Sequence, residues 1–161
     1  MSTATISDEM RALSSKFTEA FAENFLGSRE DRGELTLWVM PSAWREAAKL
    51  LMEAGFNHLS DLTAVDYLDR EPRFDVMAIL ASHKTCTYLR LKTVVDDQQP
   101  VDSLTPLWVG ANWFEREVWD LFGIHFTDHP GLKRILLPAD YTGHPLRKDY
   151  PITGPAGSVF R

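Results

Sequence analysis

Apolar residues near the start of the chain recur at helical spacing, which predicts an amphipathic helix over residues 8–26. Ser7 is in position to cap the first turn of this helix, and Gly27 can end it. The apolar stripe consists of Met10, Leu13, Phe17, Phe21 and Phe25. Such a stripe is typical of a helix surface that faces a hydrophobic core.

Alternating apolar and polar positions dominate the middle of the chain and predict strands. A second helix begins at Pro41–Ser42 and ends at Gly55, with Phe56 packing back on Leu51. The strands are expected over residues 34–40, 59–67, 73–82 and 85–95. The short polar turn between the last two predicts a hairpin. This order of elements predicts an α+β fold, with a mainly antiparallel sheet of about four strands and helices packed on one face.

The most informative helix is expected over residues 112–122. Asn112 and Glu115 have the spacing of a capping box, and Gly123 can end the helix. The face expected to pack inward carries Phe114, Val118, Leu121 and Phe122. The opposite face carries Trp113, Arg116, Glu117 and Asp120, and the spacing of Arg116 and Asp120 predicts an ion pair. A tryptophan among charges on the outer face indicates a contact surface.

The character of the chain changes after Phe122. Residues 123–161 hold five of the nine glycines and five of the nine prolines, and no helical or strand period persists there. Their net charge is +2, whereas that of residues 1–122 is −8. The segment still contains twelve large apolar residues, which a disordered tail normally lacks. We therefore predict an α+β globular domain over 1–122 and an extended Gly/Pro-rich C-terminal arm over 123–161. The surface that buries this arm could be its own domain or a partner, and a partner is favoured because so long a loop is uncommon in a compact domain.

Composition excludes several classes of function. The 161 residues are 44% hydrophobic and 25% charged, as in one globular domain. A net charge of −6 argues against nucleic-acid binding, which depends on clustered positive charge. The single cysteine, Cys86, excludes an intrachain disulfide and a thiolate-bound cluster. The chain has no membrane-spanning apolar run, and residues 1–8 have no apolar signal core, so a cytoplasmic protein is expected.

Candidate catalytic and metal sites are weak. His125, Asp128, His129, Asp140 and His144 lie close in sequence, but the flanking glycine and proline argue against helical presentation to a metal. Glu115 and Glu117 point to different sides of their helix and cannot easily act as paired carboxylates. Cys86 lies in a predicted strand and is expected to be a packed small residue. A metal-dependent hydrolase that uses His125, His129 and His144 is the least favoured alternative.

Several motifs together resemble the thirty-kilodalton (C) subunit family of respiratory complex I, the NADH:quinone oxidoreductase. The first is Ala111–Trp113 with Glu115-Arg116-Glu117 and Asp120-Leu121-Phe122-Gly123. His129-Pro130, Lys133-Arg134-Ile135-Leu136 and Gly143–Asp149 with Pro151 follow in order, and residues 61–67 (DLTAVDY) resemble a strand of the family. The resemblance covers most of the chain from about residue 56. Phe114 stands where the family commonly has tyrosine, and many members continue beyond the position of Arg161.

The resemblance implies a non-catalytic structural subunit of the peripheral arm of a proton-translocating enzyme. Other subunits would hold the FMN and Fe–S clusters that pass electrons from NADH to quinone, and this chain would hold no cofactor. The implied partners are the quinone-site (D) subunit and the B and I subunits, which hold Fe–S clusters, on the cytoplasmic side of the bacterial inner membrane. The alternative is the equivalent subunit of a membrane-bound NiFe hydrogenase or related energy-converting complex. We expect the partner interface at Trp113, Arg116, Glu117, Asp120, His129, Lys133, Arg134, His144, Arg147, Lys148 and Asp149.

Overall fold

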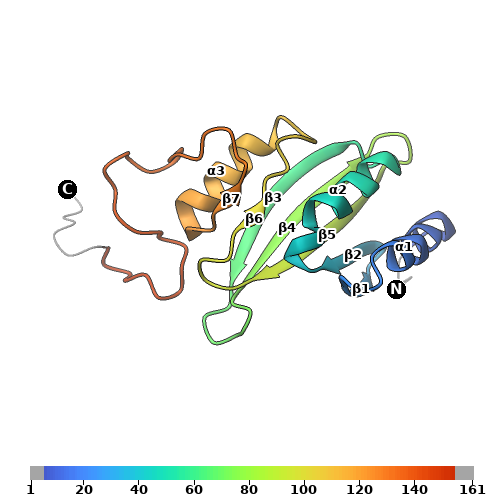
Figure 1. The fold of residues 1–161 in the computed structure, drawn as a ribbon, viewed down its shortest axis with the longest axis horizontal. Coiled ribbons are helices and arrows are strands. Elements are labelled where there is room, and N and C mark those ends of the chain that lie inside the picture. The colour runs from blue at the N-terminus through green and yellow to red at the C-terminus, as the bar shows by residue number, and fades with distance from the viewer. Residues whose placement is uncertain (1–5, 155–161) are drawn as a thin grey trace.

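This computed structural model describes residues 6–154. They contain three α-helices, one short 3-10 helix and seven strands, joined by turns and irregular segments (Figure 1). The helices are α1 (Asp8–Ala20), α2 (Trp44–Glu53) and α3 (Ala111–Phe122), and the 3-10 helix η1 (Pro41–Ala43) precedes α2. The strands are β1 (Phe25–Asp31), β2 (Glu34–Val39), β3 (His58–Asp66), β4 (Phe74–Ser82), β5 (Thr87–Val95), β6 (Val101–Asp102) and β7 (Phe126–Thr127). Residues 155–161 of the predicted arm lie outside the described residues.

Five strands form the main sheet in the order β1-β2-β5-β4-β3. β2 and β5 run parallel, and the other neighbouring pairs are antiparallel. The hairpin predicted between the third and fourth expected strands is the β4–β5 pair, whose register runs from Phe74 opposite Val95 to Ser82 opposite Thr87. The mainly antiparallel sheet is confirmed, and it has one strand more than the sequence pattern indicated.

The additional strand, β1, occupies a segment that we assigned partly to the first helix. That helix ends at Ala20, and the chain turns through Asn24 into an edge strand that pairs with β2. Phe25 still packs near the helical stripe, with its ring 6.1 Å from that of Phe17, which explains why it fitted the helical spacing. Because β1 is mostly exposed, it has no clear alternation of apolar residues. The hairpin turns at Arg32–Gly33, where both residues have positive φ, and Gly33 was the sign of this turn in the sequence.

One face of the sheet forms the hydrophobic core. Leu37, Leu91, Ala78 and Leu62 lie side by side across β2, β5, β4 and β3, and all are buried. The buried residues that the helices add to this core are Met10 and Phe17 of α1, Trp44, Ala47, Ala48 and Leu51 of α2, and Ala111, Val118 and Phe122 of α3. Each large apolar side chain buried in this way contributes about 1.5–3 kcal/mol. The prediction of helices on one face of the sheet is confirmed.

The end of α2 has the predicted geometry. Gly55 adopts φ +104, and the N–H of Phe56 donates to the carbonyl of Leu51 at 3.0 Å. The N–H of Gly55 donates to the carbonyl of Met52 at 3.1 Å, which completes a Schellman motif. α2 therefore stops where a residue with a left-handed backbone is available, and the chain turns into β3.

Candidate functional site: the anchored C-terminal arm

Asp120 of α3 is fully buried, and donors from the arm surround its carboxylate. Oδ2 accepts hydrogen bonds from the backbone N–H groups of Ile135, Leu136 and Leu137 at 3.0, 2.9 and 3.0 Å. Oδ1 accepts from the Arg134 guanidinium at 2.5 Å. Burial disfavours the charged carboxylate, but these hydrogen bonds outweigh it and lower the pKa of Asp120. The contacts fix the start of the arm against α3; we call this arrangement the Asp120 anchor.

Arg116, one turn earlier on α3, contacts the same stretch of the arm. Its Nε donates to the carbonyl of Lys133 and its Nη2 to that of Arg134, both at 3.0 Å. The guanidinium carbon also lies 5.1 Å from the centre of the Trp113 ring. The predicted ion pair between Arg116 and Asp120 is wrong, because Asp120 pairs with Arg134 and Arg116 binds arm carbonyls.

Glu115 is the second fully buried acid of α3. Its Oε1 accepts from the backbone N–H of Leu104 and its Oε2 from the Ser103 hydroxyl, both at 2.6 Å. Burial raises the pKa of Glu115 to about 7, and His129 Nε2 lies 4.0 Å from Oε2. The predicted capping box is wrong, because α3 begins at Ala111 and Glu115 reaches the loop after β6 instead of its own helix end.

The turn after α3 brings the arm back across the helix end. Gly123 adopts φ +82, and the His144 ring packs so closely that a Cβ at Gly123 would lie 2.8 Å from His144 Cδ2. His144 Nδ1 lies 2.9 Å from the Asp120 carbonyl, and the N–H of Leu146 donates to the Leu121 carbonyl at 3.0 Å. The arm therefore closes over a position where a side chain would not fit.

Gly123→Ala should therefore lower the free energy of unfolding by about 1–2 kcal/mol, because alanine is strained at positive φ and its Cβ displaces His144. Urea denaturation of the full chain measures this loss. Gly131→Ala is the matched control, since a Cβ at Gly131 would meet nothing within 4 Å. Equal stabilities of the two variants would contradict the close approach.

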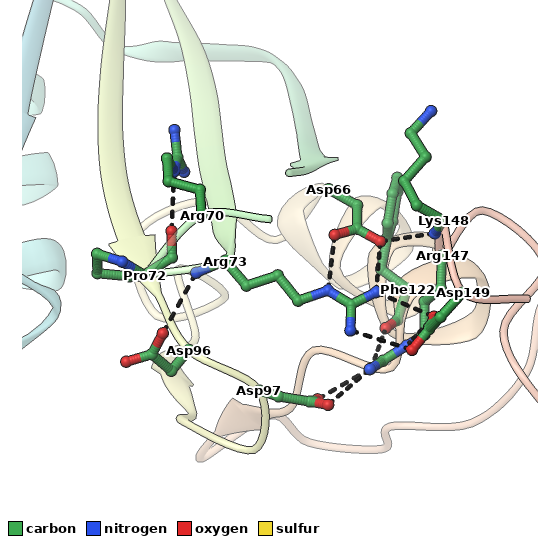
Figure 2. Close-up of polar contacts among 10 residues, drawn as sticks. All are labelled: Asp66, Arg70, Pro72, Arg73, Asp96, Asp97, Phe122, Arg147, Lys148 and Asp149. Carbon is green, nitrogen blue, oxygen red and sulfur yellow. Dashed lines mark hydrogen bonds and ion pairs between the residues drawn. The ribbon is translucent and has the colours of Figure 1, made fainter. Parts of the chain in front are cut away.

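A cluster of charged side chains joins the later part of the arm to the ends of the sheet (Figure 2). Arg73 donates two hydrogen bonds of 2.7 Å to Asp66 and two, of 3.1 and 2.9 Å, to Asp149. Arg147 donates to both oxygens of Asp97, at 2.9 and 2.6 Å. We call Asp66, Arg73, Asp97, Arg147 and Asp149 the clasp.

The clasp joins three segments that are far apart in the sequence. The first runs from Asp66 at the end of β3 to Arg73 before β4, the second is Asp97 after β5, and the third is residues 147–149 of the arm. The backbone N–H of Lys148 adds a 2.7 Å hydrogen bond to Asp66. Hydrogen bonds from Arg73 lower the pKa of Asp66, and those from Arg147 lower the pKa of Asp97, so both acids are charged at neutral pH.

The residues predicted for a partner interface divide into two groups. Arg116, Asp120, His129, Arg134, His144, Arg147 and Asp149 make hydrogen bonds or ion pairs within this chain. The exposed residues are Trp113, with 60% of its surface accessible, Glu117, Lys133, Lys148 and Asp149, the last of which is also paired with Arg73. The partner interface stays a prediction, and it now rests on the exposed residues.

The candidate catalytic and metal-binding residues do not come together at one site. Within residues 6–154, no group of three His, Cys, Asp or Glu side chains is placed to hold a metal ion. Asp128 pairs with Arg45 at 3.2 Å, and His129 accepts from the N–H of Gly131 at 3.0 Å, while His125 is exposed. The placement of Cys86 in a strand is wrong: it lies in an exposed turn with φ +50, and β5 begins at Thr87.

Sequence reasoning missed three residues of the clasp, Asp66, Arg73 and Asp97. A usable signal existed for Asp66, which continues the inward-facing alternation of Leu62 and Ala64 and so places an acid where the core face requires an apolar residue. Glu115 gave the same signal on α3, because it shares a helix face with Ala111 and Val118. A buried acid needs a partner, and these positions indicate where the rest of the chain comes back.

An α+β domain that holds a long arm through the buried Asp120 and a charged cluster has the construction of an interaction subunit. The model of the family described as "Respiratory-chain NADH dehydrogenase, 30 Kd subunit" matches residues 37–156. The chain therefore belongs to that family, as its motifs indicated.

Close relatives extend the match over nearly the whole chain. The C subunit of NADH-quinone oxidoreductase from Roseiflexus sp. (strain RS-1) is 47% identical over 153 residues, which cover 92% of this chain and 84% of that protein. The corresponding C subunit from Geobacter sulfurreducens is 46% identical, with 91% of this chain and 92% of that protein covered. NADH-ubiquinone oxidoreductase subunit 9 of Reclinomonas americana is 48% identical, and the match spans 76% of this chain and 62% of that longer protein.

Solved structures share the fold. A trypsin-resistant fragment (1–134) of Nqo5 superposes with a TM-score of 0.68 and 28% identity, covering 77% of this chain and 99% of that one. A chain of the archaeal membrane-bound sulfane sulfur reductase superposes with a TM-score of 0.78 at 20% identity, covering 90% of this chain and 87% of that one, which is a likeness of fold alone. In the described part of this chain, every helix is too short or too polar to span a membrane.

Proposed function

We propose that this chain is a structural subunit of the peripheral arm of a proton-translocating NADH:quinone oxidoreductase. Family membership and 47% identity to the C subunit of such an enzyme support this assignment. The observation that carries the structural role is the Asp120 anchor, which fixes an irregular arm on α3 and leaves apolar side chains facing outward. The exposed apolar residues on α3 and the arm are Trp113, Leu136, Leu146 and Ile152.

In this proposal the redox chemistry belongs to other chains. FMN and Fe–S clusters reside in partner subunits, and this chain contributes no catalytic residue and no cofactor ligand. The single exposed cysteine, Cys86, agrees with that division, because Fe–S clusters are held by several thiolates. Electrons would pass from NADH to quinone through neighbours that this subunit helps to align.

The partners we propose are the quinone-site (D) subunit and the B and I subunits, which hold Fe–S clusters. Contact with them would cover the outward-facing residues of the arm, since exposed apolar patches with polar rims are typical of protein interfaces. The protein would lie on the cytoplasmic side of the bacterial inner membrane and associate with it through the complex.

A pull-down with the tagged full chain from native membranes in mild detergent tests the proposal. Co-purification of flavin- and Fe–S-containing subunits, together with NADH:quinone reductase activity, is expected. Recovery of a nickel–iron large subunit with hydrogenase activity would assign the chain to the alternative energy-converting complex. Recovery of the tagged chain alone would contradict both assignments.

Trp113 provides a sharper test of the interface. Trp113→Ala should weaken binding to the partner subunits at least about tenfold, because exposed aromatic residues are frequent energetic anchors of interfaces. Yield of the assembled complex and its NADH:quinone reductase activity report this loss, while the unfolding transition of the isolated variant should change little.

Tyr88→Ala is the matched control for Trp113→Ala. Tyr88 is an aromatic residue with 57% of its surface accessible, and it lies near the β4–β5 turn, away from α3. Arg116→Ala is less informative, because it also removes the hydrogen bonds to the arm. Equal complex yields for the Trp113 and Tyr88 variants would contradict an interface at this face of α3.

A further inference from the structure

The arm is attached to its own domain in two different ways, and the change occurs near Leu137–Pro138. Before this point, the Asp120 anchor binds three consecutive backbone N–H groups. After it, residues 138–154, which we call the strap, are attached by the clasp and by hydrogen bonds of residues 143–147 to Arg134 and to the end of α3 (Figures 1 and 2). The two attachments differ in burial and in how strongly dissolved salt can weaken them.

The Asp120 anchor is buried, whereas the acids that pair with arginines in the clasp are partly exposed to solvent. The side chain of Asp120 is 0% exposed, and that of Arg134 is 13% exposed. In the clasp, the acids Asp97 and Asp149 are 50% and 47% exposed, whereas their partners Arg147 and Arg73 are 16% and 13% exposed. Ions screen exposed pairs strongly and buried pairs weakly. Salt should therefore act on the clasp and spare the Asp120 anchor.

Besides the clasp, the strap contacts Arg134 and the end of α3. His144 Nδ1 lies 2.9 Å from the Asp120 carbonyl, Arg147 donates to the Phe122 carbonyl at 3.4 Å, and Arg134 donates to the Gly143 carbonyl at 3.2 Å. Leu146 is 49% and Ile152 is 100% exposed, so these side chains give the closed strap little hydrophobic stabilisation. Leu146 donates to the Leu121 carbonyl, whereas the N–H groups of Tyr141, Arg147 and Tyr150 form turns within the strap. Such a segment can keep its local turns when it leaves the domain.

We propose that residues 138–154 form a strap that opens and closes as one unit about Leu137–Pro138, held closed by the charges of the clasp, while residues 135–137 stay bound to Asp120. Opening separates Arg147 from Asp97 and Asp149 from Arg73, and it leaves the Asp66–Arg73 pair intact on the domain. Opening also exposes the carbonyls of Asp120, Leu121 and Phe122 at the end of α3 to water, while the bonds of residues 135–137 to the Asp120 carboxylate remain.

Trypsin cleavage can probe the two parts of the arm separately. The strap of this chain contains two adjacent trypsin sites, at Arg147 and Lys148, and the stretch before it contains two more, at Lys133 and Arg134. The two pairs of sites fall on opposite sides of the proposed hinge.

Hydrogen exchange of the full chain tests the proposal at single amides. The N–H groups of Leu146 and Lys148 are bonded to the domain, to the Leu121 carbonyl and to Asp66. Between about 0.05 and 1 M NaCl, their exchange should accelerate about tenfold relative to amides of β4, because salt screens the exposed pairs. Exchange at residues 135–137 should stay within about twofold under the same conditions, because the Asp120 anchor is buried.

A charge-removing variant separates the clasp from general salt effects. Asp97→Asn should accelerate exchange at Leu146 and Lys148 already at low salt, because it loses the charge that pairs with Arg147. Asp69→Asn, an exposed acid in the β3–β4 loop, is the matched control and should change nothing. Trypsin should likewise cut first at Arg147 and Lys148.

Three outcomes would overturn the proposal. Equal acceleration at residues 135–137 and 146–148 would mean that the arm leaves as a whole. Exchange at Leu146 and Lys148 that is insensitive to salt would mean that charge does not hold the strap. A salt effect with no response to Asp97→Asn would mean that the clasp is not its origin.

Discussion

Replacing Asp120 with alanine is expected to lower the free energy of unfolding by about 3–5 kcal/mol, the largest effect of any single change in the arm region. The loss is large because the variant leaves Arg134 and three backbone N–H groups without their common acceptor in a buried site. Urea denaturation measures the loss of stability, and hydrogen exchange at residues 135–137 should lose its protection.

Two variants sharpen the Asp120 experiment. Asp120→Asn keeps one oxygen acceptor and loses the charge, so an intermediate loss of stability is expected. Glu117→Ala, an exposed acid on the same helix, should change the stability by no more than about 0.5 kcal/mol. A loss below about 1 kcal/mol for Asp120→Ala would show that the donors find other partners or water.

The second large effect is a dependence of stability on pH that originates at Glu115. The native fold raises the pKa of this carboxyl from 4.5 to about 7 by burial. Below the unfolded value both states are protonated. Between the unfolded and native pKa values, Glu115 loses its proton in the unfolded chain and keeps it in the native chain. The free energy of unfolding therefore falls as pH rises, and the stability contributed by protonated Glu115 is lost once pH has passed about 7.

The difference between the native and unfolded pKa of Glu115 lowers the free energy of unfolding by about 3 kcal/mol as pH rises from about 4 to about 8. Glu115→Gln should remove this fall, since the amide can accept from the Leu104 N–H and donate to the Ser103 hydroxyl without a charge. Burial lowers the pKa of His129, which gives a contribution of the opposite sign that rises with pH. Comparing the two proteins therefore isolates Glu115.

Thermal or urea unfolding between about pH 5 and pH 8 measures the Glu115 effect. The gap in stability between Glu115→Gln and the parent chain should widen as pH rises. Glu117→Gln on the exposed face of α3 should give a profile parallel to that of the parent. Parallel profiles for all three proteins would show that Glu115 titrates as an ordinary exposed carboxyl.

The elements predicted most accurately are those whose pattern a short stretch of chain determines. Gly55 and Phe56 end α2 as expected, and β4 and β5 form the expected hairpin. β1 was missed because an exposed edge strand has no alternation to read, and its partner β2 supplies the hydrogen bonds that define it. Local sequence patterns therefore identified the strands of the main sheet that have a buried face and did not identify its exposed edge strand, β1.

The arm and α3 residues of the candidate site were predicted, whereas Asp66, Arg73 and Asp97 and the contacts of the site were not. The motifs containing Asp120, Arg134, His144 and Arg147 were recognised, and their family is shown by the match over residues 37–156. Their contacts within the chain were not foreseen, because a helix face was judged polar and outward from its charged residues. Asp120 and Glu115 are instead buried beneath later parts of the chain.

The sequence by itself determined the α+β class, the C-terminal ends of α2 and α3, the hairpin and the family, because periodicity, turn residues and ordered motifs are properties of neighbouring positions. Only the tertiary structure decided which charges face inward and where the arm lies. Asp66 meets Arg73 and Lys148, and Asp120 meets residues 134–137, across separations that no local pattern encodes. A charged residue is compatible with solvent or with a buried partner, and only the fold brings that partner within hydrogen-bond distance.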